Sequence, residues 1–447
     1  MWAAYAGAGH FATVCRAVLP GLADLQAVSH LAPMNMQETD IVIAGGGLVG
    51  LTAALALASG RAGAPFRVVV VDAQDPRTVV GAAYDGRNSS IAYASWRLFE
   101  ALGIAHRLQG REQPINDILV TDGKVREGAS PMFLHFAAAE IADETGSAPL
   151  GHFVENRHLR EALLDAVAAC DAITLIAPAR VQNVAYHPGH VDVSLDDGSA
   201  VRAALCVAAD GRGSPVREQA GIRTVGWGYD QAGIVTTMTH DLPHEGVAQE
   251  YFLPGGPFAV LPMTGNRSSL VWTEKKSVAA DLMALDDAAF AAEAQDRFGS
   301  YLGACRPEGP RWSYPLSLQL AREYVRPRLA LVGDAAHAIH PLAGQGYNLG
   351  VRDVAALVDV LVEARDVGLD IGALTVLDRY QRWRRFDSTA LAAMTDGLNR
   401  LFSNDIALLR FARDIGLDLV NRFGPARRLF MRQAAGAVGE LPRLMRG

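Results

Sequence analysis

Several acidic residues stand where an apolar run ends beside a glycine-rich turn. In residues 329–350, an apolar run leads to Gly333-Asp334, and a loop with Pro341 then leads to Gly344-Gln345-Gly346 and a helix from about Tyr347. A carboxylate at a strand end can accept hydrogen bonds from sugar hydroxyls, and a glycine turn at a helix N-terminus offers unpaired N–H groups. This pattern fits a ligand with a sugar alcohol and a delocalised anion, such as a reduced flavin. The simpler alternative is a strand–loop–helix with an incidental aspartate.

An upstream segment supports the flavin interpretation. After the apolar run 40–44, Gly45, Gly47 and Gly50 surround Leu48 and Val49 in the pattern G-x-G-x-x-G, and an Ala- and Leu-rich helix is expected to about residue 59. A second apolar run, 66–71, ends at Asp72, near the offset of about 20 residues that places a carboxylate on a ribose. A lone G-x-G-x-x-G is weak, but one framed by two strands, a helix and a terminal acid indicates dinucleotide binding.

Residues 41–60 carry no charge, so a membrane-spanning helix is a rival interpretation. We reject it because four glycines interrupt the first half, an apolar strand follows closely, and the flanks lack a stop-transfer cluster. A dinucleotide-binding strand–helix–strand unit explains each glycine.

A third apolar run, 205–209, enters an Asp-Gly turn at Asp210, and a helix is expected to begin with Ser214 as its N-cap and Pro215 at its first position. Alone this would be an ordinary turn. Together with the two segments above, it gives three strand-to-turn acids in one chain.

These motifs resemble those of class A flavin monooxygenases, the relatives of para-hydroxybenzoate hydroxylase. The segment HPLAGQGYNLGVRD at 340–353, the run NRHL at 156–159 and the order of residues across 229–272 resemble the ubiquinone-biosynthesis hydroxylases within that class. The resemblance covers residue 38 to the C-terminus. It implies an α/β fold with a Rossmann-like FAD-binding domain, an inserted β-sheet substrate domain and a C-terminal helical region.

The expected domains are discontinuous. We assign 37–115, 150–225 and 320–375 to the FAD-binding domain, 116–149 and 226–319 to the substrate domain, and 376–447 to the helical region. Helices are expected over 88–108 and 156–170, and antiparallel strands between 173 and 210. Residues 1–36 fit no part of this scheme and are expected to be a disordered extension or the product of a start codon set too early.

Composition agrees with a cytoplasmic enzyme. The 447 residues suffice for about two domains, the net charge of −7 argues against nucleic acid as a main partner, and the four cysteines lack metal or disulfide spacing. From residue 400 onward, nine Arg oppose four acids, a local charge of +5. This basic region could lie peripherally on the inner membrane or within a biosynthetic complex. The alternative is a tail packed on the body of the protein.

The resemblance also assigns cofactor contacts. They are Gly45, Gly47, Leu48, Val49, Gly50, Asp72, Arg87, Asn156, Asp210, Gly333, Asp334, Pro341, Gly344, Gln345, Gly346 and Asn348. The first glycine turn would hold the pyrophosphate, Asp72 the adenosine ribose and Asp334 the ribityl chain, with 341–346 near the flavin ring. At these positions the chain departs from the family: the family usually has Glu at the position of Asp72, and many relatives have Arg or Gln at that of Asn156.

The chemistry implied by the resemblance belongs to the cofactor. NAD(P)H would bind transiently and reduce FAD, O2 would add at flavin C4a, and the hydroperoxide would deliver oxygen to the phenolic ring of a polyprenylated ubiquinone precursor. No metal is indicated. No catalytic base is identifiable; His337 and His340 are weak candidates, with a structural role as the alternative. Pocket candidates are Phe252, Phe258, Leu261 and Trp272, each of which could instead be core.

Two further alternatives stay open at this stage. The chain could hydroxylate another phenolic substrate with the same fold, or it could be a non-catalytic flavin-binding member of a quinone-biosynthesis complex.

Overall fold

The structure, a computed structural model, describes residues 36–61, 63–80, 84–124, 128–339, 344–402 and 424–446. Residues 1–35 of the expected extension lie outside this set. Met36 already belongs to the first strand, β1 (Met36–Glu38).

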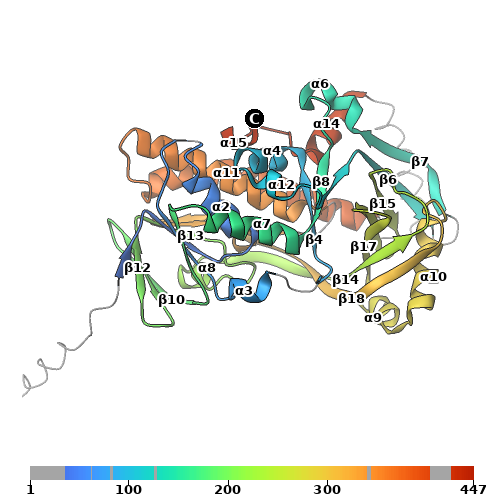
Figure 1. Ribbon diagram of the computed structural model, residues 1–447, viewed down its shortest axis with the longest axis horizontal. Helices are drawn as coiled ribbons and strands as arrows, with labels where there is room; N and C mark the ends of the chain where they lie inside the picture. The colour runs from blue at the N-terminus through green and yellow to red at the C-terminus, as the bar shows by residue number, and fades with distance from the viewer. Residues whose placement is uncertain are drawn as a thin grey trace, which may run out of the picture.

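A six-stranded sheet forms the centre of one of the two parts of the molecule, the part on the left in Figure 1, which we call the parallel-sheet unit. Its order is β19 (Val325–Arg326), β20 (Leu329–Leu331), β13 (Leu205–Ala208), β2 (Ile41–Ala44), β3 (Val68–Val71) and β9 (Ile173–Ile176). All neighbours are parallel except β19 and β20. The strands β2, β3, β13 and β20 are buried at every residue, which explains their unbroken apolar runs, because a parallel sheet is covered on both faces.

Helix α2 (Leu48–Ala58) begins at the end of β2 and packs against α7 (Asn156–Ala168) and α11 (Gln345–Asp366). Its residues from Gly50 to Ala58 are all buried. The uncharged stretch 41–60 is therefore a core strand and helix. Within the described ranges, no helix is long and apolar enough to cross a membrane.

Two smaller sheets flank this unit. One has the order β1, β12 (Ala200–Ala203), β11 (Val191–Leu195) and β10 (Val181–Tyr186); the other has β4 (Asn88–Ala92), β8 (Gly151–Glu155) and β5 (Glu112–Ile115). The helix expected over 88–108 is wrong at its start, because residues 88–92 pair with β8 as a strand. Helices α4 (Tyr93–Ala101) and α5 (Ile104–Arg107) follow. Likewise, residues 173–176, expected in an antiparallel sheet, are the parallel edge strand β9.

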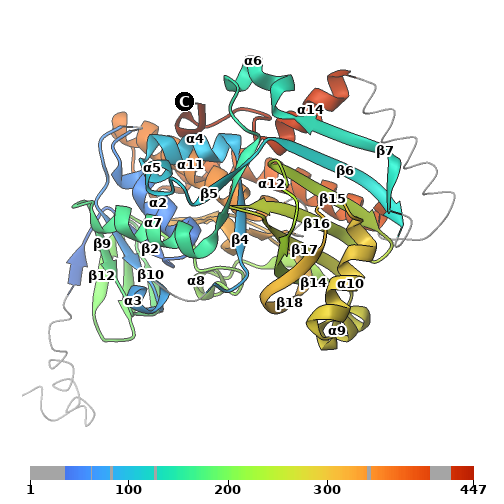
Figure 2. The same ribbon diagram turned by 45° about the vertical axis from the view of Figure 1, so that its right-hand side comes forward.

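The other part of the molecule, on the right in Figure 2, is built on an eight-stranded sheet, which we call the large sheet. Its order is β21 (His337–Ala338), β18 (Cys305–Ala321), β14 (Thr224–His240), β17 (Arg267–Lys275), β16 (Gly256–Met263), β15 (Val247–Leu253), β6 (Asp117–Lys124) and β7 (Gly128–Ala137). Helices α9 (Lys276–Ala284) and α10 (Asp287–Phe298) cover one face. The opposite face turns toward the parallel-sheet unit.

The C-terminal helices join these parts. Helix α12 (Leu374–Phe402) packs against both β19 and β16, whereas α14 (Gly424–Ala434) and α15 (Arg443–Arg446) lie on the body. Arg427 pairs with Glu140, and Arg443 Nε lies 3.1 Å from Asp359 Oδ1. The described part of the basic region is therefore packed on the protein, and residues 403–423 lie outside the described set. Short elements complete the fold: α3 (Pro76–Val79), η1 (Ala138–Ile141), α6 (Ala142–Thr145), α8 (Pro215–Gln219) and η2 (Gly333–Ala335).

Candidate active site

A cavity of about 800 Å³ lies between the parallel-sheet unit and the large sheet. Glycine turns line one part of it, which we call the turn side; side chains of the large sheet line the other part, the sheet side. The turn side includes Gly47, Leu48, Val49, Ala209, Gly211, Asp334, Gly344 and Gly346, and the sheet side includes Ile118, Val235, Ala248, Glu250, Pro257, Ala259, Leu261, Ser269, Val271 and Thr273. Sequence segments some 300 residues apart thus converge on one volume.

The first glycine turn is shaped by close backbone contacts. Gly45 has a φ of +102°, and a Cβ there would lie 2.5 Å from the Ala209 oxygen; a Cβ on Gly50 would lie 1.9 Å from the Gly45 oxygen. Gly47 differs, because a Cβ there would meet nothing within 4 Å and the residue lines the cavity. It is also the N-cap of α2, with no side chain capping the helix. This helix end therefore offers free N–H groups and a positive dipole to the cavity.

Helix α11 brings a second N-terminus to the same cavity. Its N-cap is Gly344, with a φ of +63° in the left-handed region, and no side chain caps the helix. Gly346 lines the cavity, and Gln345 begins the first turn. Neither α2 nor α11 has an acid in its first turn. Two uncapped helix ends beside one cavity suit an anionic ligand with more than one negative group.

The three predicted acids occupy different places around the turn side. Asp334 lines the cavity itself. Asp72 holds the first glycine turn, since its Oδ2 accepts from Gly46 N at 2.5 Å and its Oδ1 from Gln74 N at 2.6 Å. Asp210 Oδ2 accepts from Val216 N at 3.1 Å, whereas its Oδ1 is buried and without a hydrogen-bond partner. Burial raises the pKa of Asp210.

These features fit a dinucleotide such as FAD. The open space at Gly47, Gly211 and Gly346, the two uncapped helix ends and the carboxylate of Asp334 suit a ligand with anionic groups and hydroxyl donors. Asp72 and Asp210 do not line the cavity themselves.

Arg87 and Asn156 both line the cavity but already have partners. Arg87 pairs with Asp85 at 2.5 Å on the exposed side of its turn. The Asn156 Oδ1 accepts from Ser89 Oγ at 2.7 Å, and the Asn156 backbone N donates to the Arg87 oxygen at 3.0 Å. The two residues thus tie α7 to the start of β4.

Asn348 is buried and does not line the cavity. Its Oδ1 accepts from Ala92 N at 2.9 Å, and its Nδ2 donates to the Ser90 oxygen at 2.7 Å. The structure thus corrects the expected flavin contact: the amide of Asn348 fastens β4 to α11. Gly333, at a φ of +58°, packs against Val49 instead of facing the cavity.

His337 belongs to a buried ion cluster. Its Nε2 lies 2.5 Å from Asp353 Oδ2, and Arg384 Nε lies 2.8 Å from Asp353 Oδ1. Burial would raise the pKa of Asp353, but His337 and Arg384 outweigh it and the pKa is lowered. Gly333 N also donates to Asp353, at 3.0 Å. Since His337 does not line the cavity, its contacts give it the structural role rather than the catalytic one; His340 and Pro341 lie outside the described residues.

Of the four predicted pocket residues, one lines the cavity and three are buried elsewhere. Leu261 lines the cavity, and so do Pro257 and Ala259 on the same strand. Phe258 and Trp272 are fully buried in the cluster beneath α9 and α10, and Phe252 lies in another cluster with Met431. The expectation was therefore wrong for Phe258 and Trp272, because alternate residues of a strand point to opposite faces. Phe252 is on the same face of β15 as Ala248 and Glu250, but it packs in the cluster with Met431 and does not line the cavity.

Glu250 is a cavity-lining acid that the motifs did not indicate. Burial raises its pKa to about 7. The only sequence signal is its place in the alternation Ala248, Glu250, Phe252 on β15, where apolar residues are expected on an inward face.

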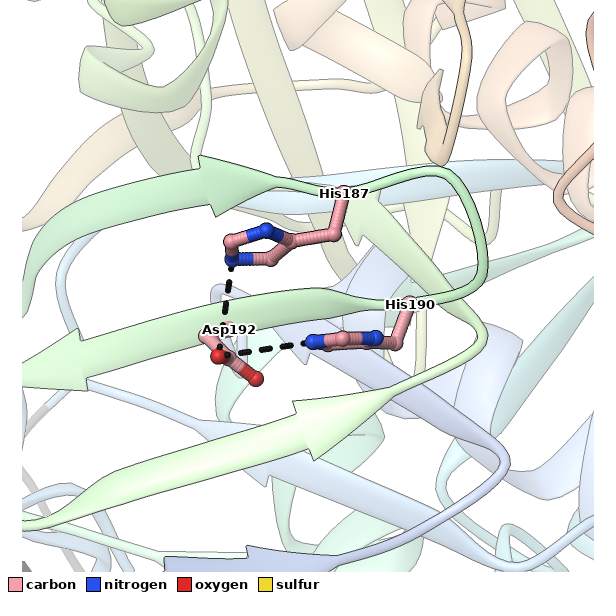
Figure 3. Close-up of side chains that lie close together, drawn as sticks. All are labelled: His187, His190 and Asp192. Atoms are coloured by element: carbon pink, nitrogen blue, oxygen red, sulfur yellow. Dashed lines mark ion pairs between the residues drawn. The ribbon is translucent and has the colours of Figure 1, made fainter.

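A second cluster of possible ligands lies away from this cavity, on the small sheet. His187, His190 and Asp192 approach within 4.8 Å of one another, and both imidazole Nε2 atoms lie 3.6 Å from Asp192 Oδ2 (Figure 3). Arg202, however, binds both oxygens of Asp192, at 2.8 and 2.9 Å. Because a guanidinium holds the carboxylate, we assign this cluster to the stability of the hairpin.

Known proteins match this chain over most of its length. A family described as an FAD binding domain matches residues 38–393. The chain is 51% identical over 411 residues to ubiquinone hydroxylase UbiL of Rhodospirillum rubrum, covering 91% of this chain and 92% of the relative. It is 37% identical over 406 residues to the 3-demethoxyubiquinol 3-hydroxylase of Escherichia coli, covering 90% of this chain and all of the relative.

Solved structures agree on the fold. The p-nitrophenol 4-monooxygenase PnpA from Pseudomonas putida superposes with a TM-score of 0.74 at 19% identity, covering 91% of this chain and all of that one. HpxO of Klebsiella pneumoniae, solved with FAD and uric acid, gives a TM-score of 0.67 at 19% identity, covering 90% and 96%. The chain belongs to the ubiquinone-biosynthesis hydroxylase family of FAD-dependent aromatic monooxygenases.

Proposed function

We propose that this enzyme hydroxylates the aromatic ring of a polyprenylated ubiquinone precursor, with O2 as the oxygen source and NAD(P)H as a transient electron donor. The observation that carries the proposal is the single cavity with two unlike sides. The turn side has free backbone N–H groups and the carboxylate of Asp334, and the sheet side has aliphatic side chains such as Ile118, Leu261 and Val271. A cofactor with phosphates and a substrate with an apolar ring and tail have opposite requirements, which these two sides match.

The turn side would hold FAD. Gly47, Leu48 and Val49 at the N-terminus of α2 would bind the pyrophosphate, and Asp72 and Asp334 would accept hydroxyl protons of the ribose and ribityl groups. The backbone of 344–346, at the N-terminus of α11, would stabilise negative charge on the flavin ring. Bound FAD would take electrons from the nicotinamide and pass one oxygen atom of O2 to the substrate.

The sheet side would orient the ring and exclude water. Ala248, Ala259 and Leu261 form a smooth aliphatic surface on β15 and β16. A phenolic ring that packs on it is held against translation, while its prenyl tail continues along apolar side chains. Exclusion of water would prevent the release of hydrogen peroxide without hydroxylation of the substrate. Membrane contact through the basic region from residue 400 onward and membership of a biosynthetic complex stay predictions.

The decisive experiment combines flavin analysis with product analysis. The purified protein is expected to carry FAD and to convert 2-geranylphenol, with NADH or NADPH, into a catechol or hydroquinone that contains one oxygen atom from ¹⁸O2. Deletion of the gene should cause accumulation of the quinone precursor that lacks this hydroxyl. Protein that binds FAD but forms no hydroxylated product from prenylated phenols would overturn the proposal.

A further inference from the structure

The sheet side of the cavity carries one acid on an aliphatic surface. Alternate residues of β16 and β17 line the cavity, and so do Ala248, Gln249 and Glu250 on β15. In the sheet register it stands opposite Ala259 on β16 and Val120 on β6. Its neighbours along the cavity face of β15 are Ala248 and Phe252. None of these four neighbouring side chains can donate a hydrogen bond to the carboxylate.

No described residue donates a hydrogen bond to the Glu250 carboxylate or forms an ion pair with it. The acids that line the cavity among the described residues are Glu250 and Asp334, and Asp334 lies on the turn side. Two polar side chains of the sheet side have other partners: Gln249 Oε1 accepts from the Tyr251 hydroxyl, and Ser269 Oγ accepts from Asn88 Nδ2 at 3.1 Å. An unpartnered acid on an apolar surface is unfavourable for folding, which is typical of a group kept for a ligand.

We propose that Glu250 accepts the phenolic proton of the substrate. This inference rests on the proposed function and assigns it a catalytic residue. Transfer of the O–H proton to a Glu250 oxygen leaves the electron pair on the phenolic oxygen, which raises electron density at the ortho and para ring carbons. After a ring carbon has gained its oxygen, that carbon loses its hydrogen as a proton to water, and Glu250 returns its own proton to the phenolic oxygen. The oxygen atom and electrons come from O2 and the nicotinamide.

The acidity of Glu250 suits this exchange. Burial raises its pKa to about 7, so both protonation states are accessible near neutral pH. Other charged groups belong to the cavity and to the elements packed around it. Arg87, Arg212 and Asp334 line the cavity. β17 carries Arg267, Glu274 and Lys275, β6 carries Asp117 among its described side chains, α14 carries Arg427, Arg428 and Arg432, and β16 carries no charged residue. Burial is the sole cause of the shift, so none of these groups sets the pKa.

The test uses the FAD-loaded full chain as wild type, Glu250→Gln and Glu250→Asp, with Asp281→Asn on the exposed side of α9 as the matched control. Dissociation constants are measured by equilibrium dialysis for 2-geranylphenol and its methyl ether. The wild type is expected to prefer the phenol by a factor of about 10 or more, and Glu250→Gln should lose most of that preference. Hydroxylation of 2-geranylphenol should fall by about 10²-fold or more in Glu250→Gln. The control should match the wild type in both measurements.

A pH profile separates a proton acceptor from a packing role. In the wild type, the rate constant for hydroxylation should rise as the pH increases through about 7, since the carboxylate is the accepting form. Glu250→Gln should lack this rise, and Glu250→Asp should retain it at a reduced rate even if the Gln variant folds poorly. A Gln variant with full FAD content, the wild-type rate and the wild-type pH profile would overturn the inference. If the wild type binds the phenol through Glu250 but forms no hydroxylated product, the proposed function fails instead.

Discussion

The two sides of the cavity differ in how the sequence specifies them. The turn side is built from backbone: Gly45 and Gly50 permit contacts that no Cβ could make, and Gly47 and Gly344 leave two helix ends uncapped. The sheet side is built from side chains, and its chemistry depends on which alternate residues of each strand face inward. Backbone motifs are local in sequence, whereas a strand face is decided by packing across the whole sheet. Mutations on the turn side should therefore impair cofactor binding, whereas mutations on the sheet side should change stability or substrate binding.

The largest effect is expected on the turn side. Gly50→Val should abolish FAD binding, because even a Cβ there would overlap the Gly45 oxygen. Gly397→Ala is the control, since a Cβ on Gly397 of α12 meets nothing within 4 Å. Flavin absorbance of the purified proteins provides the measurement. A Gly50→Val protein with stoichiometric FAD would show that the turn is not the cofactor cradle.

The ion cluster behind the turn side should come next. Arg384→Leu leaves Asp353 and His337 buried without their third partner and should reduce the free energy of unfolding by about 3–5 kcal/mol. Arg382→Leu, on the exposed side of the same helix, removes a surface pair with Asp378 and should change it by less than about 1 kcal/mol. Denaturant unfolding of both variants compares them. Equal stabilities would remove the structural role assigned to His337.

Successive residues of β16 face opposite sides of the large sheet, so substitutions at Phe258 and Ala259 should affect different properties. Phe258→Ala should reduce the free energy of unfolding by about 3–5 kcal/mol, because Phe258 is fully buried beneath α9 and α10. Ala259→Phe should leave FAD content unchanged but raise the KM for 2-geranylphenol, because Ala259 faces the cavity. Thermal unfolding and steady-state kinetics distinguish the two. A cavity effect from Phe258→Ala without loss of stability would reverse the assigned faces.

The smallest predicted effect concerns pH and stability. The folded pKa of Glu250, about 7, lies above the usual 4.5, so ionisation opposes folding. The folded state therefore binds more protons between these values, and its stability falls as pH rises through this range. Glu250→Gln should match the wild type near pH 4.5 and exceed its stability by about 1–3 kcal/mol at pH 8. Unfolding free energies at the two pH values provide the comparison, and a difference that does not change with pH would contradict the raised pKa.

Sequence reasoning predicted the turn side better than the sheet side for a physical reason. The strand–glycine–helix order around Gly45, Ser214 as an N-cap and the turn at Gly344 follow from local backbone constraints, and the structure contains all three. The family and fold class were also predicted, and the comparisons confirm both. The strand at 88–92 was read as helix because its pairing with β8 is a long-range contact.

The errors at Phe258 and Trp272 share one origin. Register places both on the face of the large sheet away from the cavity, whereas Glu250 on β15 lies on the cavity face. Hydrophobic alternation shows that a strand has two faces but does not state which face meets the ligand. Asn348 was read as a flavin contact because its amide partners, Ser90 and Ala92, lie more than 250 residues away.

The central claim is that cofactor and substrate share one cavity, with the flavin at the turn side and the ring at the sheet side. Titration of the FAD-loaded protein with 2-geranylphenol, followed through the visible flavin spectrum, tests this most directly. The wild type should give a saturable spectral change, and Ala259→Phe, with the same FAD content, should give little or none at the same concentrations. An identical spectral response in both proteins would contradict the claim.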